Sequence, residues 1–227
     1  MPKEGSRKPI LIFRVFLKIS SMYLPFFPLK LVAFPGEELN LHIFEPRYRQ
    51  LMADAEKDGI NFGVCIYLNQ MTGFGTEVKL EQIFKRYEDG RLDIKTRGVR
   101  AFRMLNFENR MSERLYPGGE IEYLNDDSSI NQMHQLEYVF YLKEILHLLN
   151  HPVEFEPFSV SSYSFAHKVG LKLEEELELL QIESESLRIE FLIKHFKRLI
   201  PVIKAIESAK EKIKLNGHFK HLDPLNF

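Results

Sequence analysis

The stretch that decides the fold is Leu24-Pro25-Phe26-Phe27-Pro28-Leu29, followed closely by Val32-Ala33-Phe34-Pro35-Gly36. Both are short apolar runs interrupted by proline or glycine, which is typical of short strands joined by turns. The chain continues in this manner to about Leu124, and from about Asp127 to Leu215 its apolar residues recur at helical spacing instead. Strands followed by helices, rather than alternating with them, predict an α+β fold.

The next segments outward from this stretch are a strand and a short helix. Residues 39–43 alternate apolar and polar side chains, which is the period of a half-buried strand. Pro46 has a fixed φ that suits a first helical position, and Gly59 suits a helix end. The apolar residues between them fall on one helical face: Tyr48, Leu51, Met52 and Ala55.

More strands follow this helix. We expect them at residues 62–68, 77–87, 91–105 and 120–124. Glu88-Asp89-Gly90 predicts a hairpin turn because such turns need positive φ, and Gly98 predicts a bulge in the strand after it. Gly73-Phe74-Gly75 is interpreted as a turn. About six strands around a short helix predict a small closed or partly closed barrel.

The second part of the chain is predicted to be a helical bundle. Helices are expected at residues 133–149, 163–169 and 173–180, and a long one from about Ser184. Gly217 is placed to cap the last helix in a left-handed conformation. The acidic run Glu174-Glu175-Glu176 is expected to be a solvated face near a helix start, where the helix dipole favours negative charge.

This pattern divides the chain into four parts. They are an N-terminal extension (1–21), a barrel (22–126), a helical part (127–216) and a C-terminal tail (217–227). The extension carries five basic residues and one acidic residue, Glu4. Met22 is a plausible true start of the protein, so we expect residues 1–21 to be dispensable. A basic amphipathic segment on a membrane surface is the alternative. The tail is apolar at Phe219, Leu222, Leu225 and Phe227, which favours docking on the protein.

Composition narrows the class of function. The formal net charge of the 227 residues is −1, whereas a dedicated nucleic-acid binder usually carries a basic excess. The single cysteine, Cys65, cannot form a disulfide within the chain, which favours a reducing compartment and a cytoplasmic location. The apolar stretch 10–19 is interrupted by Arg14 and Lys18 and is too short for a membrane span.

No catalytic, cofactor or metal site is expected. The sequence contains neither the GxxxxGK[ST] phosphate loop nor the GxSxG nucleophile elbow. Helix capping explains the serines at 159, 161, 162 and 164. His147 and His151 are four residues apart, but Pro152 interrupts the helix there and the glutamate of HExxH is missing, so two helix-end histidines are favoured over a metal site.

One basic cluster leaves an alternative open. It comprises Lys85, Arg86, Arg91, Lys95, Arg97, Arg100 and Arg103. With Tyr87 and Phe102 beside it, an RNA-binding strand face is conceivable. Acidic residues are interleaved with the cluster, so solvated strands with cross-strand ion pairs are favoured.

The opening stretch and several later segments resemble the N-terminal domain of Lon proteases. The later segments are Gly75-Thr76-Glu77-Val78, residues 93–103 and residues 177–192, and the resemblance covers roughly Leu24 to Ile213. Phe44-Glu45-Pro46-Arg47-Tyr48 is more similar to the stand-alone bacterial members. The signature positions are Leu24, Pro25, Pro28, Leu29, Phe34, Pro35, Gly36, Phe44, Glu45, Pro46, Arg47, Tyr48, Gly75, Thr76, Gly98 and Arg103.

The resemblance implies a PUA-like β-barrel followed by a helical bundle. It also implies a module that engages substrate polypeptide, with the ATPase and protease domains of Lon absent from this sequence. We therefore expect a non-catalytic polypeptide-binding or adaptor module in protein quality control, whose partner is extended polypeptide, a protease or a chaperone. An RNA-binding protein with a PUA-like barrel is the alternative, and a small hydrolase ranks last. The resemblance does not identify the polypeptide-binding residues.

Overall fold

A computed structural model describes residues 22–218, with side chains described as far as residue 214. The predictions for the extension (1–21) and for docking of the tail after His218 lie outside the described residues. The elements in chain order are β1 (Met22–Leu29), β2 (Glu38–Ile43), α1 (Pro46–Asp58), β3 (Phe62–Tyr67), β4 (Met71–Arg86), β5 (Leu92–Met104), β6 (Gly118–Tyr123), α2 (Gln132–Leu148), the 3₁₀ turn η1 (Ala166–Lys168), α3 (Leu173–Gln181) and α4 (Glu185–His218). The fold is α+β, as predicted.

The six strands form one mixed sheet that closes into a barrel. Their order is β2-β5-β4-β3-β1-β6, and an additional pairing between β5 and β6 closes the ring. β1 changes partner along its length, because Met22–Pro25 pairs antiparallel with β6 and Phe26–Leu29 pairs parallel with β3. Among the described strands, β2 pairs with β5 alone. The predicted barrel of about six strands is confirmed.

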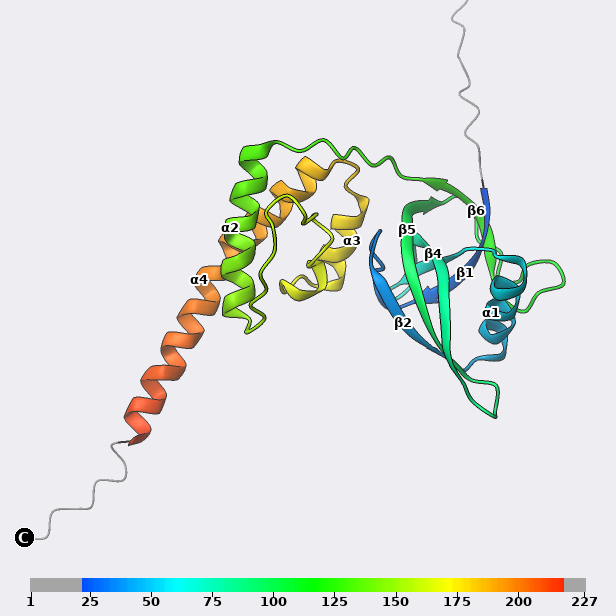
Figure 1. The fold of residues 1–227 in the computed structure, drawn as a ribbon, viewed down its shortest axis with the longest axis horizontal. Helices are drawn as coiled ribbons and strands as arrows, with labels where there is room; N and C mark the ends of the chain where they lie inside the picture. The colour runs from blue at the N-terminus through cyan, green and yellow to red at the C-terminus, as the bar shows by residue number, and fades with distance from the viewer. Residues whose placement is uncertain (1–21, 219–227) are drawn as a thin grey trace, which may run out of the picture.

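The first helix follows its prediction. α1 begins at Pro46, ends before Gly59 at φ 66°, and buries Tyr48, Leu51, Met52 and Ala55. These side chains pack into a barrel core that also contains Phe27, Ile43, Phe62, Val64 and Ile94. α1 therefore covers one side of the barrel, away from the other helices (Figure 1).

Two glycine predictions have different outcomes. The pairing of β4 with β5 shifts register where Glu77 pairs with Arg100 and Val78 with Gly98, which confirms the bulge. Gly73-Phe74-Gly75 lies within β4, so its interpretation as a turn is wrong. A Cβ on Gly75 would lie 2.7 Å from the Phe102 ring, so the glycine makes room for an aromatic side chain inside a strand.

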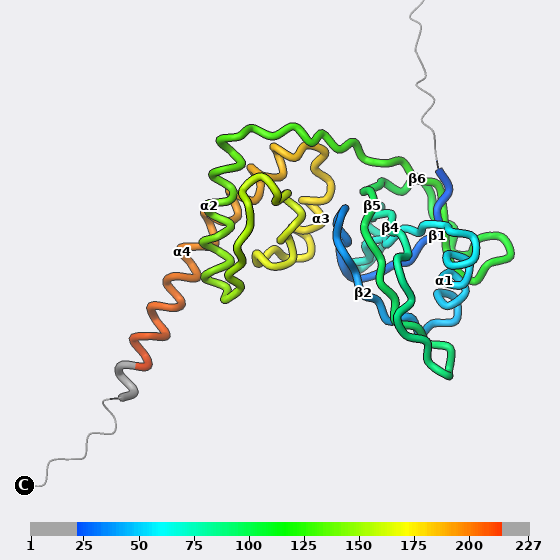
Figure 2. Tube along the Cα trace, in the orientation of Figure 1, coloured from blue at the N-terminus to red at the C-terminus, as the bar shows by residue number. Residues whose placement is uncertain are grey.

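The helical part lies beside the β2 and β5 side of the barrel, and the trace between β6 and α2 joins the two (Figures 1 and 2). One apolar core continues across the junction. Val32, Phe34, Ile66 and Ala101 of the barrel belong to the same buried cluster as side chains of α2, α3 and α4. The division into parts at residues 126 and 127 remains a prediction.

Two helical predictions need correction. Only Ala166–Lys168 of the expected helix at 163–169 is helical, and as a 3₁₀ turn. The hydroxyl of Ser164 accepts a hydrogen bond from the Ser161 amide (3.0 Å), and such local bonds compete with helix formation. α4 continues through Gly217 to His218, past the predicted cap.

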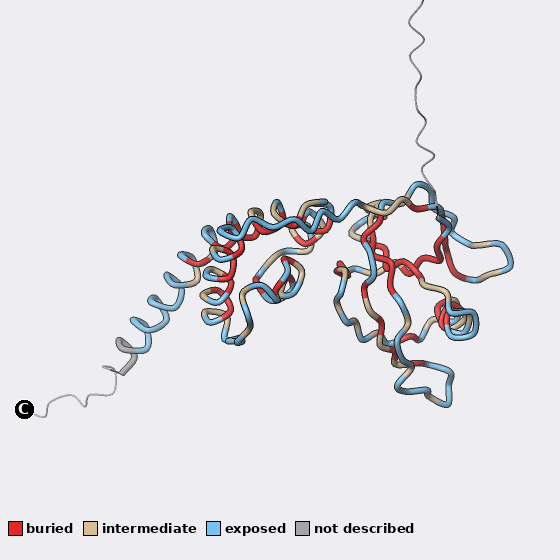
Figure 3. Tube along the Cα trace, turned by 45° about the horizontal axis from the view of Figure 1, so that its top comes forward, coloured by how far each residue is buried: buried red, intermediate tan, exposed pale blue. Residues whose placement is uncertain are grey.

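The distal part of α4 extends beyond the rest of the molecule (Figure 2). Every residue from Lys204 to Lys214 is exposed, which contrasts with the alternating burial of the helix before Pro201 (Figure 3).

Candidate functional site

Six of the sixteen signature positions line two pockets of the fold, and the other ten line neither. Pro28, Leu29, Arg47 and Tyr48 line a pocket at one end of the barrel, here called the barrel pocket. Pro35 and Gly36 line a second pocket at the junction with the helical part, here called the seam pocket. The motif that decides the fold therefore contributes to both pockets.

The barrel pocket is an open apolar hollow of about 380 Å³. Four elements or loops build it: the end of β1, the first turn of α1, the β3–β4 hairpin and the loop before β6. Its lining is Pro28, Leu29, Lys30, Arg47, Tyr48, Tyr67, Met71, Phe107, Asn109 and Pro117. Tyr67 and Phe107 are 44% and 42% exposed, so two large aromatic side chains remain in water beside it.

Packing fixes the floor of the barrel pocket. The ring of Tyr48 is buried and lies 4.1 Å from that of Phe27, centroid to centroid. Burial raises the pKa of Tyr48 to about 12, so its hydroxyl is neutral at physiological pH. The guanidinium of Arg47 lies over the same ring, with its carbon 4.5 Å from the centroid. An aromatic floor with exposed aromatic walls suits an apolar side chain.

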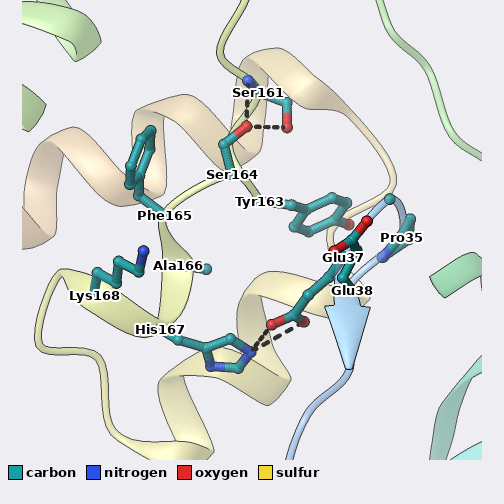
Figure 4. Close-up of a pocket in the computed structure, with 11 residues that line it drawn as sticks. Pro35, Glu37, Glu38, Ser161, Tyr163, Ser164, Phe165, Ala166, His167 and Lys168 are labelled. Carbon is teal, nitrogen blue, oxygen red and sulfur yellow. Dashed lines mark hydrogen bonds and ion pairs between the residues drawn. The ribbon is translucent and has the colours of Figure 1, made fainter. Parts of the chain in front are cut away.

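The seam pocket is larger, at about 480 Å³, and more polar (Figure 4). Its walls come from the turn before β2, the start of β2 and the segment 161–168. Phe34 lies buried behind it, with its ring stacked on Tyr163 at 5.0 Å. Gly98 is needed for this junction, because a Cβ there would lie 2.1 Å from the Phe34 carbonyl oxygen.

His167 joins the two parts of the molecule at the seam pocket. Its Nε2 lies 3.1 Å from a carboxylate oxygen of Glu37 before β2 (Figure 4). Its Nδ1 lies 2.7 Å from a carboxylate oxygen of Glu176 on α3. Desolvation lowers the pKa of His167, but the hydrogen bonds and charges of the two carboxylates outweigh it and raise the pKa to about 10. The protonated imidazole therefore links barrel and helical part. We call Glu37, His167 and Glu176 the seam clamp.

The family model of the ATP-dependent protease La (LON) substrate-binding domain matches residues 23–198. The chain belongs to this family. The match ends before Ile213, so it covers less of α4 than the sequence resemblance did.

Two solved structures are similar to this Lon substrate-binding domain. The Lon N-terminal domain protein from Xanthomonas campestris is 28% identical with a TM-score of 0.60, and the alignment covers 76% of this chain and 98% of that one. The N-terminal domain of Mycobacterium avium complex Lon protease is 14% identical with a TM-score of 0.58, covering 78% and 98%. The second likeness concerns the fold alone.

The candidate nucleophiles of this domain have other partners. Ser162 is fully buried, and its hydroxyl donates to Glu185 at 2.7 Å. The hydroxyls of Ser161 and Ser164 lie 3.1 Å apart. Both ring nitrogens of nearby His167 already contact the carboxylates of Glu37 and Glu176. Desolvation raises the pKa of the buried Cys65 thiol, which disfavours the thiolate. This arrangement does not favour a hydrolase.

Neither a metal site of three or more ligands nor a membrane-spanning helix is found among the described residues. α2 ends at Leu148, so His151 lies beyond the helix and does not share a helical face with His147. Within residues 22–218, no group of three or more potential ligands gathers to hold a metal ion. No helix in the described part of the chain is long and apolar enough to cross a membrane.

The basic cluster is largely paired with carboxylates. Arg86 pairs with Glu56, Arg91 with Asp89, Lys95 and Arg97 with both Glu38 and Glu81, and Arg103 with Glu122. Lys85 and Arg100 lie over the rings of Tyr87 and Tyr123. The favoured interpretation of solvated strands with ion pairs therefore fits the structure better than an RNA-binding face.

Sequence reasoning missed a buried ionic network. Arg188 on α4 donates to the Ser162 hydroxyl (3.1 Å), Glu185 (2.9 Å), the Ile182 carbonyl (2.8 Å) and Asp126 (2.7 Å). The side chains of Arg188 and Glu185 are 4% and 5% exposed. In the sequence, Glu185 and Arg188 are a charged pair three residues apart in a helix, which predicts only an ion pair on the surface. Asp126 and Ser162 are too distant in sequence to form a recognisable pattern with them.

Glu176 and the barrel-pocket aromatics were also missed. Glu176 is buried against His167, so the expectation of a solvated acidic face is wrong for it, although Glu174 is exposed. Phe107 carried a usable signal, since it stands between the polar residues Asn106 and Glu108, whereas Tyr67 stands between Ile66 and Leu68 and resembles a buried strand residue. An aromatic residue between polar residues indicates an exposed contact surface.

Proposed function

We propose that this chain is a non-catalytic module that binds extended or unfolded polypeptide, and that the barrel pocket receives an apolar side chain of that polypeptide. One observation carries the proposal. In a member of the Lon substrate-binding family, four signature positions line an apolar pocket whose aromatic walls, Tyr67 and Phe107, are left exposed.

The barrel pocket supports this function better than the seam pocket does. Three of the four charged residues that line the seam pocket are already paired: His167 with Glu37, and Glu38 with Lys95. The fourth, Lys168, is exposed and lies over the Phe165 ring. A ligand that engages Glu37, Glu38 or His167 would have to displace internal ion pairs. In the barrel pocket a ligand would displace water from a lining that is mostly apolar, which is favourable.

The wider role follows from the kind of ligand. A module that recognises apolar segments would select unfolded chains, because folded proteins bury such segments. We therefore propose a place in protein quality control in the cytoplasm, in which the module presents polypeptide to a protease or chaperone partner. On this proposal the purified chain neither hydrolyses ATP nor degrades casein.

The test is binding of reduced, carboxymethylated α-lactalbumin, a permanently unfolded protein, measured by fluorescence anisotropy. Phe107→Ala and Tyr67→Ala should each weaken binding about 5- to 30-fold, since losing a buried aromatic contact costs roughly 1–2 kcal/mol. Phe84→Ala is the matched control, because Phe84 is 53% exposed on β4 and lies outside the pocket lining. Thermal midpoints of all variants separate lost binding from lost folding.

Two results would contradict the proposal. One is absence of binding by the unaltered chain at high micromolar concentration. The other is equal weakening by Phe84→Ala and Phe107→Ala, which would mean that exposed aromatics attract polypeptide without a specific pocket. Turnover of casein abolished by a point substitution would overturn the non-catalytic assignment.

A further inference from the structure

The barrel pocket has an uneven charge distribution. Its lining contains two basic residues, Lys30 and Arg47, and no acidic residue. Most of the remaining lining is apolar or aromatic. Over the whole 227-residue chain Lys and Arg number 31 and Asp and Glu 32, so a rim with basic residues alone is a local feature.

The two cations differ in their availability. Arg47 is held in place, since its guanidinium donates to Glu45 at 2.9 Å and lies over the Tyr48 ring. Lys30 follows the end of β1 and is exposed. Within residues 22–218, no carboxylate lies within ion-pair distance of its ammonium group. Lys30 is therefore the free charge at this rim.

The carboxylates adjacent in sequence to the lining do not neutralise Lys30. Glu45 is the partner of Arg47. Glu108 lies between the lining residues Phe107 and Asn109, and it accepts a hydrogen bond from the Tyr23 hydroxyl at 2.8 Å. A negative charge brought by a ligand would therefore meet Lys30 without competition from these groups.

We propose that the barrel pocket selects polypeptide segments in which a bulky apolar side chain has an Asp or Glu next to it. The apolar side chain enters the hollow between Tyr67 and Phe107, and the acidic side chain lies at the rim beside Lys30. A basic neighbour would meet Lys30 as a like charge. This selectivity rests on the proposed function, because it specifies the ligand of the same pocket.

The expected preference is modest and dependent on salt. Ion pairs between exposed groups contribute little, so an acidic neighbour should tighten binding about 2- to 5-fold over a neutral one at low ionic strength. A basic neighbour should weaken binding by a similar factor. At 0.5 M NaCl the three affinities should converge, since screening acts over only a few ångströms at that concentration.

The test uses three fluorescein-labelled peptides with acetylated N-termini and amidated C-termini, so that no terminal carboxylate contributes. They share one Leu-Phe core and carry Asp, Asn or Lys on both sides of it. Lys30→Glu should reverse the order of the three affinities measured by anisotropy. Lys79→Glu is the control, because Lys79 is exposed on β4 outside the pocket lining and the substitution changes net charge equally.

The outcomes separate the two proposals. The order Asp, Asn, Lys in the unaltered chain, reversed by Lys30→Glu alone, supports the acidic preference. Equal affinities for the three peptides overturn the preference while leaving polypeptide binding intact. Reversal by Lys79→Glu as well would assign the effect to overall charge and overturn the role of Lys30. Binding of none of the peptides, together with none of carboxymethylated α-lactalbumin, overturns the proposed function itself.

Discussion

Replacing Arg188 with methionine should destabilise the whole chain severely. Arg188 connects three segments that are distant in sequence: the end of the barrel at Asp126, the turn at Ser162 and the start of α4 at Glu185. Its guanidinium also lies over the Tyr163 ring, with its carbon 4.6 Å from the centroid. Loss of the guanidinium leaves the carboxylate of Glu185 buried without a counter-ion.

The magnitude follows from burial. Breaking a buried ion pair by removing one partner costs about 3–5 kcal/mol, because an uncompensated charge stays in the interior. For a chain of this size each 1 kcal/mol lowers the thermal midpoint by roughly 2–4 °C. Arg188→Met should therefore lower it by about 6–20 °C. Removing both charges in Arg188→Met/Glu185→Leu should recover at least about half of that loss, since no unpaired charge is left in the interior and the side chain of Asp126, 56% exposed, is solvated.

The assay is thermal unfolding followed by circular dichroism, with Lys194→Met as the matched control. Lys194 pairs with Glu190 on the same helix, but the two side chains are 73% and 45% exposed, so the pair should contribute less than about 1 kcal/mol. If Arg188→Met lowers the midpoint no more than Lys194→Met does, the network does not hold the junction. If the double variant is less stable than Arg188→Met, the argument from an unpaired charge is wrong.

Three further predictions concern the seam and its surroundings. The folded pKa of His167 is raised to about 10, above its ordinary value of 6.5, so its contribution to stability should be complete below pH 6.5 and lost as the pH rises towards 10. Between pH 6.5 and 10 the thermal midpoint should therefore fall less steeply in His167→Gln than in the unaltered chain. Equal slopes would exclude the seam clamp. Gly98→Ala should lower the free energy of unfolding, measured with urea, by about 1–3 kcal/mol or more, because the added Cβ would collide with the fixed Phe34 carbonyl. Gly73→Ala should cost only about 1 kcal/mol, since φ is +80° there and nothing lies within 4 Å, and a larger loss than for Gly98→Ala would refute the steric argument.

Local patterns predicted most of the barrel because each depends on neighbours in sequence. Pro46 and Gly59 bound α1, and Gly90 at φ 84° forms the hairpin turn between β4 and β5. The prediction failed where the same residue type serves two purposes. Gly75 resembles a turn glycine, but inside β4 it makes room for the ring of Phe102, a contact that only the barrel creates.

The sites were harder to predict because they join distant segments. Residues of the seam clamp at 37, 167 and 176 meet only after the helical part has packed on the barrel. The Arg188 network draws on residues 126, 162 and 185 in the same way. Each member has an ordinary local explanation, as a turn acid, a capping serine or an i and i+3 ion pair, and no spacing in the sequence connects them.

Burial separates the signature positions into two kinds. Phe34 is fully buried, and the backbone at Gly98 lies against its carbonyl, so packing at the junction explains both residues. Leu24 and Gly75 are likewise explained by the barrel interior around Phe102. Arg47 is different, because its side chain is 42% exposed, and its ion pair with Glu45 and its contact with the Tyr48 ring each contribute only about 1 kcal/mol or less at an exposed site. A residue type that folding does not require, placed over the floor of an apolar pocket, is better explained by what the pocket binds, and this is why the barrel pocket is the stronger candidate for the polypeptide site.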